Sequence, residues 1–209
     1  MWRQGKWLLT AFMAIALAAA TTARAEISAG DRAKLVKYLT TTRDQVIGEA
    51  ENLSDAQWSF KPAPDRWSVG EVVEHLALAE PFIFGLQQKL ASGPAATAEQ
   101  LKAAQGRDAL ILKTIADRTK KANAPEPLQP TAKLGKRPDV LAAFRDARAK
   151  TLEYASKTTD DLRSRVGDSP IGPTDAYQWL LFIGAHTERH LAQLREVKAH
   201  EQFPKSGTP

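Results

Sequence analysis

Residues 68–91 read SVGEVVEHLALAEPFIFGLQQKLA and carry the clearest structural signal in the chain. Ser68 and Glu71 stand in the capping-box pattern that marks the start of a helix. Apolar residues then recur every three or four positions, as on the buried face of an amphipathic helix. These residues are Val69, Val72, Val73, Leu76, Ala79, Ile83 and Leu86. Pro81 lies within the pattern and predicts a kink, so the stretch predicts one long, kinked helix that other elements must cover.

Several other segments also read as helices, and none reads convincingly as a strand. A short helical turn is predicted at Ser54, where residues 54–57 (SDAQ) have capping-box form. The linker from Ala122 to Lys136 contains three prolines and no apolar periodicity, which favours a crossover or an overlying loop over a tight hairpin. The four further helices are expected over residues 31–53, 97–121, 138–156 and 174–200. The pattern therefore predicts a single all-α bundle.

The first 25 residues have the order of parts of an export signal. Arg3 and Lys6 precede an apolar run from Trp7 to Ala20, and residues 23–25 (ARA) match the small-x-small cleavage pattern. The alternative is a retained membrane anchor, since charged residues lie on both sides of the apolar run. The run is, however, shorter than the roughly 20 residues that span a bilayer. We therefore expect a secretory signal peptide over 1–25, one domain over 26–209, and a periplasmic or secreted protein with no membrane attachment after cleavage.

Composition restricts the class of partner. The 209 residues are 43% hydrophobic and 25% charged, as in an ordinary globular protein. The formal net charge of +5 becomes +2 once the three basic residues of the signal are removed, and the remaining basic residues form no aromatic-interleaved stripe. We expect no nucleic-acid binding. Because the chain has no cysteine, it has no disulfide and any metal must be held by histidines and carboxylates.

The chain has four histidines, which are His75, His186, His190 and His200. His186 and His190 are four residues apart, so they lie one turn apart on the core-facing side of the last predicted helix. His75 lies on the inner face of helix 68–91. Three such imidazoles could hold a divalent metal and leave coordination positions open. The spacing alone leaves a second interpretation, in which buried histidines are hydrogen-bonded core residues. We expect His200, at a helix end, to lie at the surface.

Three segments together resemble the DinB-like superfamily. They are residues 53–62 (LSDAQWSFKP), 65–76 (DRWSVGEVVEHL) and 186–194 (HTERHLAQL), and the resemblance covers essentially residues 26–209 in order. It implies a four-helix bundle of the DinB-like type, here with an extra short helix and the long proline-rich connection. It also implies that His75, His186 and His190 bind one divalent metal ion, namely Zn, Ni or Fe.

The resemblance implies a metal-dependent hydrolase or a group transferase acting on a small molecule. The alternative is a non-catalytic metal-binding or structural bundle. Some members use bacillithiol, mycothiol or glutathione, but these thiols are mainly cytosolic and we expect this chain to be exported. The substrate is therefore not carried over from the family. No residue stands out as a general base, and the resemblance leaves a homodimer open.

Other residues near the histidines have two interpretations each. Trp67 is either a wall of the site or a core residue packed against the helix start. Glu71 is either a cap or a general base, and its capping-box position favours the cap. Glu74 adjoins His75 but is expected to point away from it. Tyr177 and Trp179 either line a pocket mouth or pack within the bundle.

Overall fold

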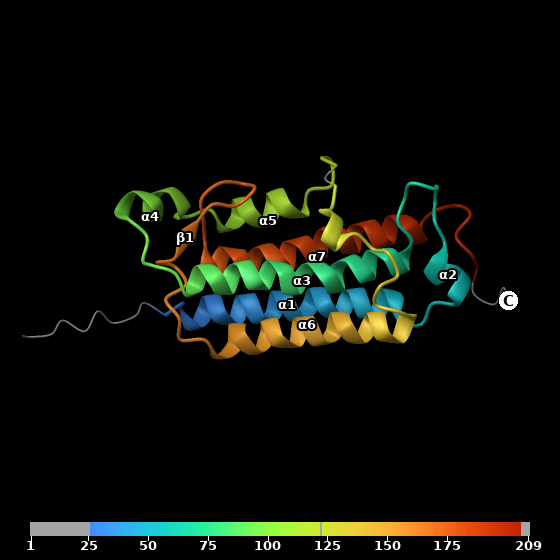
Figure 1. The fold of residues 1–209 in the computed structure, drawn as a ribbon, viewed down its shortest axis with the longest axis horizontal. Helices are drawn as coiled ribbons and strands as arrows, with labels where there is room; N and C mark the ends of the chain where they lie inside the picture. The colour runs from blue at the N-terminus through green and yellow to red at the C-terminus, as the bar shows by residue number, and fades with distance from the viewer. Residues whose placement is uncertain (1–25, 122, 206–209) are drawn as a thin grey trace, which may run out of the picture.

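A computed structural model describes residues 26–121 and 123–205, and these residues form a helical bundle (Figure 1). The bundle consists of four long helices, α1 (Ala29–Ala50), α3 (Val69–Ala91), α6 (Arg137–Lys157) and α7 (Ala176–Lys198). α1 and α3 each pack against both α6 and α7, and the interior between the four helices contains two clusters of buried apolar residues. The predicted all-α four-helix bundle is therefore confirmed.

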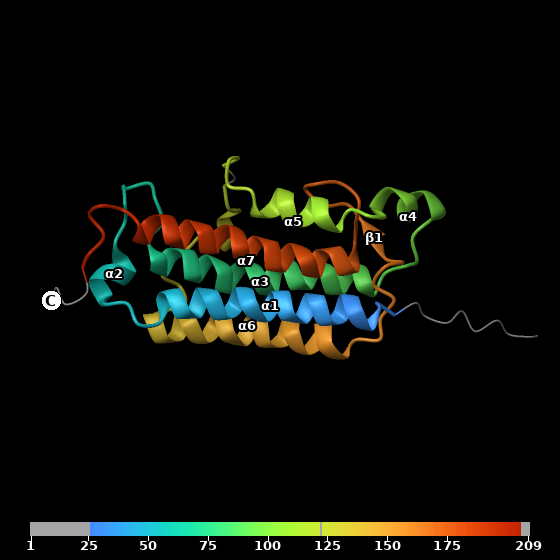
Figure 2. The ribbon, with the colours of Figure 1, turned by 180° about the vertical axis from the view of Figure 1, so that it is seen from behind.

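The order of helix directions explains the long connection. α1 and α7 run in one direction, and α3 and α6 run in the other (Figures 1 and 2). Because α3 and α6 are parallel neighbours, the chain between them must return along the length of the bundle. This return is made by α4 (Ala98–Ala104), α5 (Asp108–Ala116), which packs on α7, and a linker that contains the 3₁₀ turn η1 (Glu126–Leu128).

The predicted helix over residues 97–121 is wrong as one element. Thr97 caps α4 with Gln100 as predicted, but α4 ends before Gly106, whose φ is +71°. A glycine in this left-handed conformation ends a helix, because the carbonyl ladder cannot continue through it. α5 then begins at Asp108 in a new direction. The two other predicted capping boxes, at Ser54 before α2 (Asp55–Ser59) and at Ser68 before α3, are present.

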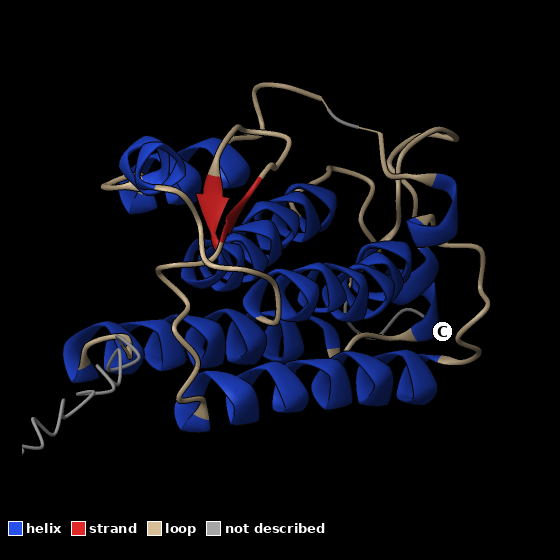
Figure 3. Ribbon diagram, turned by 60° about the vertical axis from the view of Figure 1, so that its left-hand side comes forward, coloured by secondary structure: helices blue, strands red, loops and turns tan. Residues whose placement is uncertain are grey.

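The start of α7 also differs from the prediction. Asp175, rather than Thr174, caps the helix, and Gln178 completes its capping box. Thr174 instead pairs with Gly167 in a short antiparallel ladder of β1 (Val166–Gly167) and β2 (Thr174–Asp175), which the sequence analysis did not predict (Figure 3). The ladder secures the loop over residues 168–173 at one end of the bundle.

A buried ion pair lies in the middle of the bundle. The Arg148 guanidinium on α6 lies 2.6 Å from a carboxylate oxygen of Glu80 on α3, and both side chains are buried. Arg148 also donates hydrogen bonds to the Leu39 carbonyl and Thr42 on α1 and to Thr187 on α7. One side chain thus connects all four helices.

No helix among residues 26–121 and 123–205 is long and apolar enough to cross a bilayer.

Candidate metal centre

Three imidazoles from two helices meet inside the bundle. His75 comes from α3, and His186 and His190 come from α7. The Nε2 atom of His186 lies 3.3 Å from Nε2 of His75 and 3.2 Å from Nε2 of His190. One potential ligand atom from each residue lies within 4.8 Å of the other two. The structure therefore brings together the three residues that the sequence analysis selected.

Local sequence explains how the helices reach this position. The capping box of Ser68 and Glu71 starts α3 less than two turns before His75. Gly184, two residues before His186, lets α1 approach α7 closely, because a Cβ at this position would lie 2.4 Å from Cε1 of Tyr38. Glycine is required here for close helix packing.

In two of the three rings, hydrogen bonds determine which nitrogen is free to bind a metal ion. The carbonyl oxygen of Leu128 lies 2.8 Å from Nδ1 of His75, and Oε1 of Gln193 lies 2.9 Å from Nδ1 of His190. Both oxygens are acceptors, so each Nδ1 carries the proton and each Nε2 presents its lone pair. Such outer hydrogen bonds orient metal-binding histidines in known sites.

The spacing of the nitrogens fits a metal ion. Two nitrogens that are each about 2.05 Å from a zinc ion, at a tetrahedral angle, lie roughly 3.3 Å apart. The two Nε2–Nε2 distances measured from His186 have this value. Three neutral imidazoles form a donor set that suits Zn, Ni or Fe. The residues present could therefore hold one divalent ion with coordination positions left over.

Burial keeps the three rings neutral. It lowers the pKa of His75, and it lowers the pKa of His190 well below the usual value, with a further contribution from His186. It lowers the pKa of His186 to about 3, and the neighbouring His75 adds to the effect. Neutral imidazoles are the form that binds metals, so the site needs no deprotonation near neutral pH.

The three rings differ in exposure. His75 and His190 are buried, whereas His186 is half-buried. The indole of Trp67 covers the buried side, with its ring 5.0 Å from that of His75 and 6.2 Å from that of His190. Trp67 is thus a wall of the site as well as a packed residue. His186 is the most exposed of the three rings.

The acidic residues next to the histidines in sequence all have other partners. Glu71 caps α3 and pairs with Lys61, which confirms the cap. Glu74 points away from His75, as predicted, and its carboxylate accepts hydrogen bonds from the backbone N–H groups of Ala132 and Leu134. These contacts hold the linker beside the site. Glu188 accepts a hydrogen bond from Tyr38 on the outside of the bundle.

The contacts of Leu128, Gln193 and Glu74 were missed by the sequence analysis. Gln193 had a detectable signal, since it lies three residues after His190 on the same helix face. Leu128 acts through its backbone carbonyl, which no side-chain pattern reveals. Glu74 bonds to residues about 60 positions away, so its role also has no local signal.

The remaining candidates lie away from the three rings. His200 packs against Phe60, with ring centroids 5.5 Å apart, and has no contact with the cluster. Tyr177 packs within the bundle, where the Arg163 guanidinium lies 3.9 Å from its ring centroid and its hydroxyl bonds to the Asp31 carbonyl. Trp179 lines a cavity.

Comparisons with known proteins agree with this architecture. The sequence is 27% identical to the uncharacterized protein YuaE of Bacillus subtilis over 164 residues, which cover 75% of this chain and 92% of that protein. The fold is similar to that of YfiT from Bacillus subtilis, described as a probable metal-dependent hydrolase with an unusual four-helix bundle topology. That match has a TM-score of 0.53 at 14% identity and covers 87% of this chain and 93% of the other. The profile of the DinB superfamily matches residues 38–194, and the chain therefore belongs to the DinB superfamily.

Proposed function

We propose that the protein binds one divalent metal ion through His75, His186 and His190 and uses it to hydrolyse, or to transfer a group of, a small-molecule substrate. The observation that carries the proposal is the convergence of three Nε2 atoms at metal-ligand spacing, with one of the rings open to solvent. A metal ion in this setting supplies a Lewis acid that polarises a carbonyl group and activates water.

The chain's own residues prepare the site for this chemistry. Leu128 and Gln193 hold the Nδ1 protons of His75 and His190, so that both Nε2 lone pairs face the centre. Trp67 excludes water from the buried side and leaves the approach beside His186. Because Glu71, Glu74 and Glu188 are held by other partners, the proposed mechanism assigns no general base to them.

The similarity to YfiT supports the four-helix-bundle fold on which this proposal depends. The description of YfiT as a probable metal-dependent hydrolase suggests the reaction class. The proposed periplasmic or secreted location rests on the signal pattern in residues 1–25, which lie outside the described residues. The proposal includes a small-molecule substrate and no nucleic-acid partner.

Elemental analysis tests the metal centre directly. The protein is purified without an immobilised-metal column, in parallel with His186→Ala and with His200→Ala as a matched histidine control. We expect about one equivalent of Zn, Ni or Fe in the wild type and in His200→Ala, and its loss from His186→Ala. Absence of metal from all three proteins after reconstitution would contradict the proposal.

A second measurement separates a catalytic centre from a structural one. Cobalt-substituted protein is titrated with azide, which changes the visible spectrum of cobalt when it enters an open coordination position. We expect a saturable spectral change. Metal binding without any response to azide would favour the non-catalytic bundle.

A further inference from the structure

Two large apolar side chains on α3 remain exposed although the bundle core is well packed. Phe82 is 51% exposed and Leu86 is 39% exposed. They follow His75 by seven and eleven residues, and at 3.6 residues per turn both lie within roughly 20° of His75 around the helix. The exposed apolar surface of α3 is therefore a continuation of the helix face that carries one of the three imidazoles.

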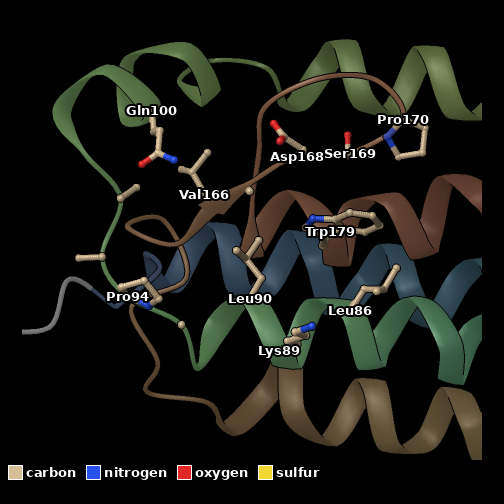
Figure 4. A pocket seen from close by; sticks show the side chains of 14 residues that line it. Leu86, Lys89, Leu90, Pro94, Gln100, Val166, Asp168, Ser169, Pro170 and Trp179 are labelled. Atoms are coloured by element: carbon tan, nitrogen blue, oxygen red, sulfur yellow. The ribbon is translucent and has the colours of Figure 1, made fainter.

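The neighbouring helix α7 carries a row of aromatic rings that begins beside His186. Phe182 stacks on His186, with ring centroids 6.3 Å apart and ring planes 19° apart. Trp179 continues the row, with its ring 5.2 Å from that of Phe182. α3 and α7 pack against each other, so Phe82 and Leu86 lie on one helix and Phe182 and Trp179 on its neighbour. Leu86 and Trp179 line the same cavity (Figure 4). We call these four residues the apolar track.

The apolar track ends in a cavity of about 630 Å³. Figure 4 shows Leu86 and Leu90 of α3, Val166 of β1 and Trp179 of α7 around it. Its volume falls in the range of about 300–1,000 Å³ that is usual for small-molecule sites. The polar groups shown in Figure 4, including Lys89 and Asp168, belong to the same lining.

The cavity lies close enough to the imidazoles for one ligand to reach both. Trp179 precedes His186 by seven residues, which is roughly 10 Å along a helix. His186 is the half-buried ring, and Phe182, which is also partly exposed, lies directly beside it. A row of ring contacts therefore leads from His186 through Phe182 to Trp179, which lines the cavity.

We infer that the substrate carries an extended apolar arm, such as a medium-length acyl or alkyl chain, that lies along Phe82 and Phe182 and ends in the cavity beside Leu86 and Trp179. This inference rests on the proposed function, because the metal centre holds the reacting end of the ligand. The apolar arm accounts for the exposure of Phe82 and Leu86, since the bound ligand removes their surface from water.

The test uses two hydroxamic acids that share a metal-binding head and differ only in the arm. Binding of acetohydroxamic acid and octanohydroxamic acid to the zinc-loaded protein is measured by calorimetry. A fully buried methylene strengthens binding roughly fourfold, so we expect the longer compound to bind at least about a hundredfold more tightly. In Leu86→Gln we expect this ratio to fall by about tenfold or more, with unchanged affinity for acetohydroxamic acid.

Leu101→Gln is the matched control. Leu101 is 37% exposed, close to the value for Leu86, but it does not line the cavity, so the ratio should stay as in the wild type. Equal affinities for the two compounds in the wild type would overturn the inference and leave the metal centre standing. Failure of both compounds to bind the zinc-loaded protein would overturn the proposed function and the inference together.

Analytical ultracentrifugation of the same variants tests whether the apolar track is instead a dimer interface. If Leu86→Gln converted a dimer into a monomer without changing the hydroxamate ratio, the apolar track would be an interface between two copies of the chain. That result would also overturn the inference. We expect Leu86→Gln and the wild type to have the same oligomeric state.

Discussion

The carbonyl oxygen of Leu128 lies 2.8 Å from Nδ1 of His75, although the two residues are 53 positions apart. Leu128 belongs to the proline-rich linker that returns the chain from α5 to α6. The backbone of this linker, rather than a side chain, therefore sets the tautomer of one proposed metal ligand. Glu74, the neighbour of His75, holds the same linker through Ala132 and Leu134.

Removing Glu74 should weaken metal binding without touching a ligand. In Glu74→Ala the N–H groups of Ala132 and Leu134 lose their acceptor, so the Leu128 carbonyl is no longer held beside His75. Loss of such an outer contact typically lowers metal affinity 10–100-fold, and we expect about tenfold in competition with a chelating dye. Glu71→Ala, which removes a cap and the pairing with Lys61 but no contact with the linker, is the control. Equal affinities of the two variants would contradict this role.

Gln193 should act on His190 in the same way. Gln193→Leu removes the acceptor of the Nδ1 proton, and we expect metal affinity to fall about tenfold. Gln193→Glu keeps an acceptor oxygen and should retain the affinity of the wild type. A loss of affinity in both variants would contradict this role of the acceptor oxygen.

The metal-free protein should lose stability in mild acid. Burial lowers the pKa of His186 to about 3 and lowers those of His75 and His190, whereas an unfolded histidine titrates near 6.5. Below about pH 6.5 the unfolded chain binds protons that the folded chain does not, so the free energy of unfolding decreases as pH falls towards 3.

Urea unfolding of the chelator-treated protein at about pH 7 and about pH 5 measures this effect. We expect a lower unfolding midpoint at the lower pH and a smaller difference in His186→Leu. An equal difference between the two pH values in the wild type and in His186→Leu would contradict the assignment of the effect to these rings.

Arg148 should be the most costly single residue to remove from the bundle core. Arg148→Met leaves the buried Glu80 carboxylate unpaired, and we expect the free energy of unfolding to fall by about 3–5 kcal/mol. The double variant Arg148→Met, Glu80→Leu removes both charges and should regain most of this loss. Chemical denaturation of the three proteins checks the prediction, which fails if the double variant is the least stable.

Two glycines in helices should respond to alanine in opposite ways. Gly184→Ala places a Cβ 2.4 Å from the Tyr38 ring and should destabilise the protein by about 1–3 kcal/mol through overpacking between α1 and α7. Gly48→Ala lies in α1 with nothing within 4 Å of the new Cβ, and should stabilise the protein by up to about 1 kcal/mol. Thermal unfolding of both variants measures the contrast, and a common sign would contradict it.

Helices with strong local signals were predictable. The apolar period and the caps at Ser68 and Thr97 are properties of a few adjacent residues, and the structure confirms them except at Leu86. Leu86 was expected on the buried face of α3 and is 39% exposed, because no other element among the described residues covers this end of the apolar stripe. The break at Gly106 was missed because an isolated glycine within a helical pattern is also tolerated in helices. The ladder of Gly167 with Thr174 was missed because strands of two residues have no detectable period.

The sequence by itself determined the helical class, the inner face of each long helix and the placement of His186 and His190 one turn apart, since these depend on helical geometry within one segment. Tertiary structure alone decided that His75 meets that pair, that the Leu128 carbonyl orients it, and that Arg148 pairs with Glu80. Each of these contacts joins residues far apart in the chain, so it depends on which helices pack together and at what register, and no local pattern of residues encodes that choice.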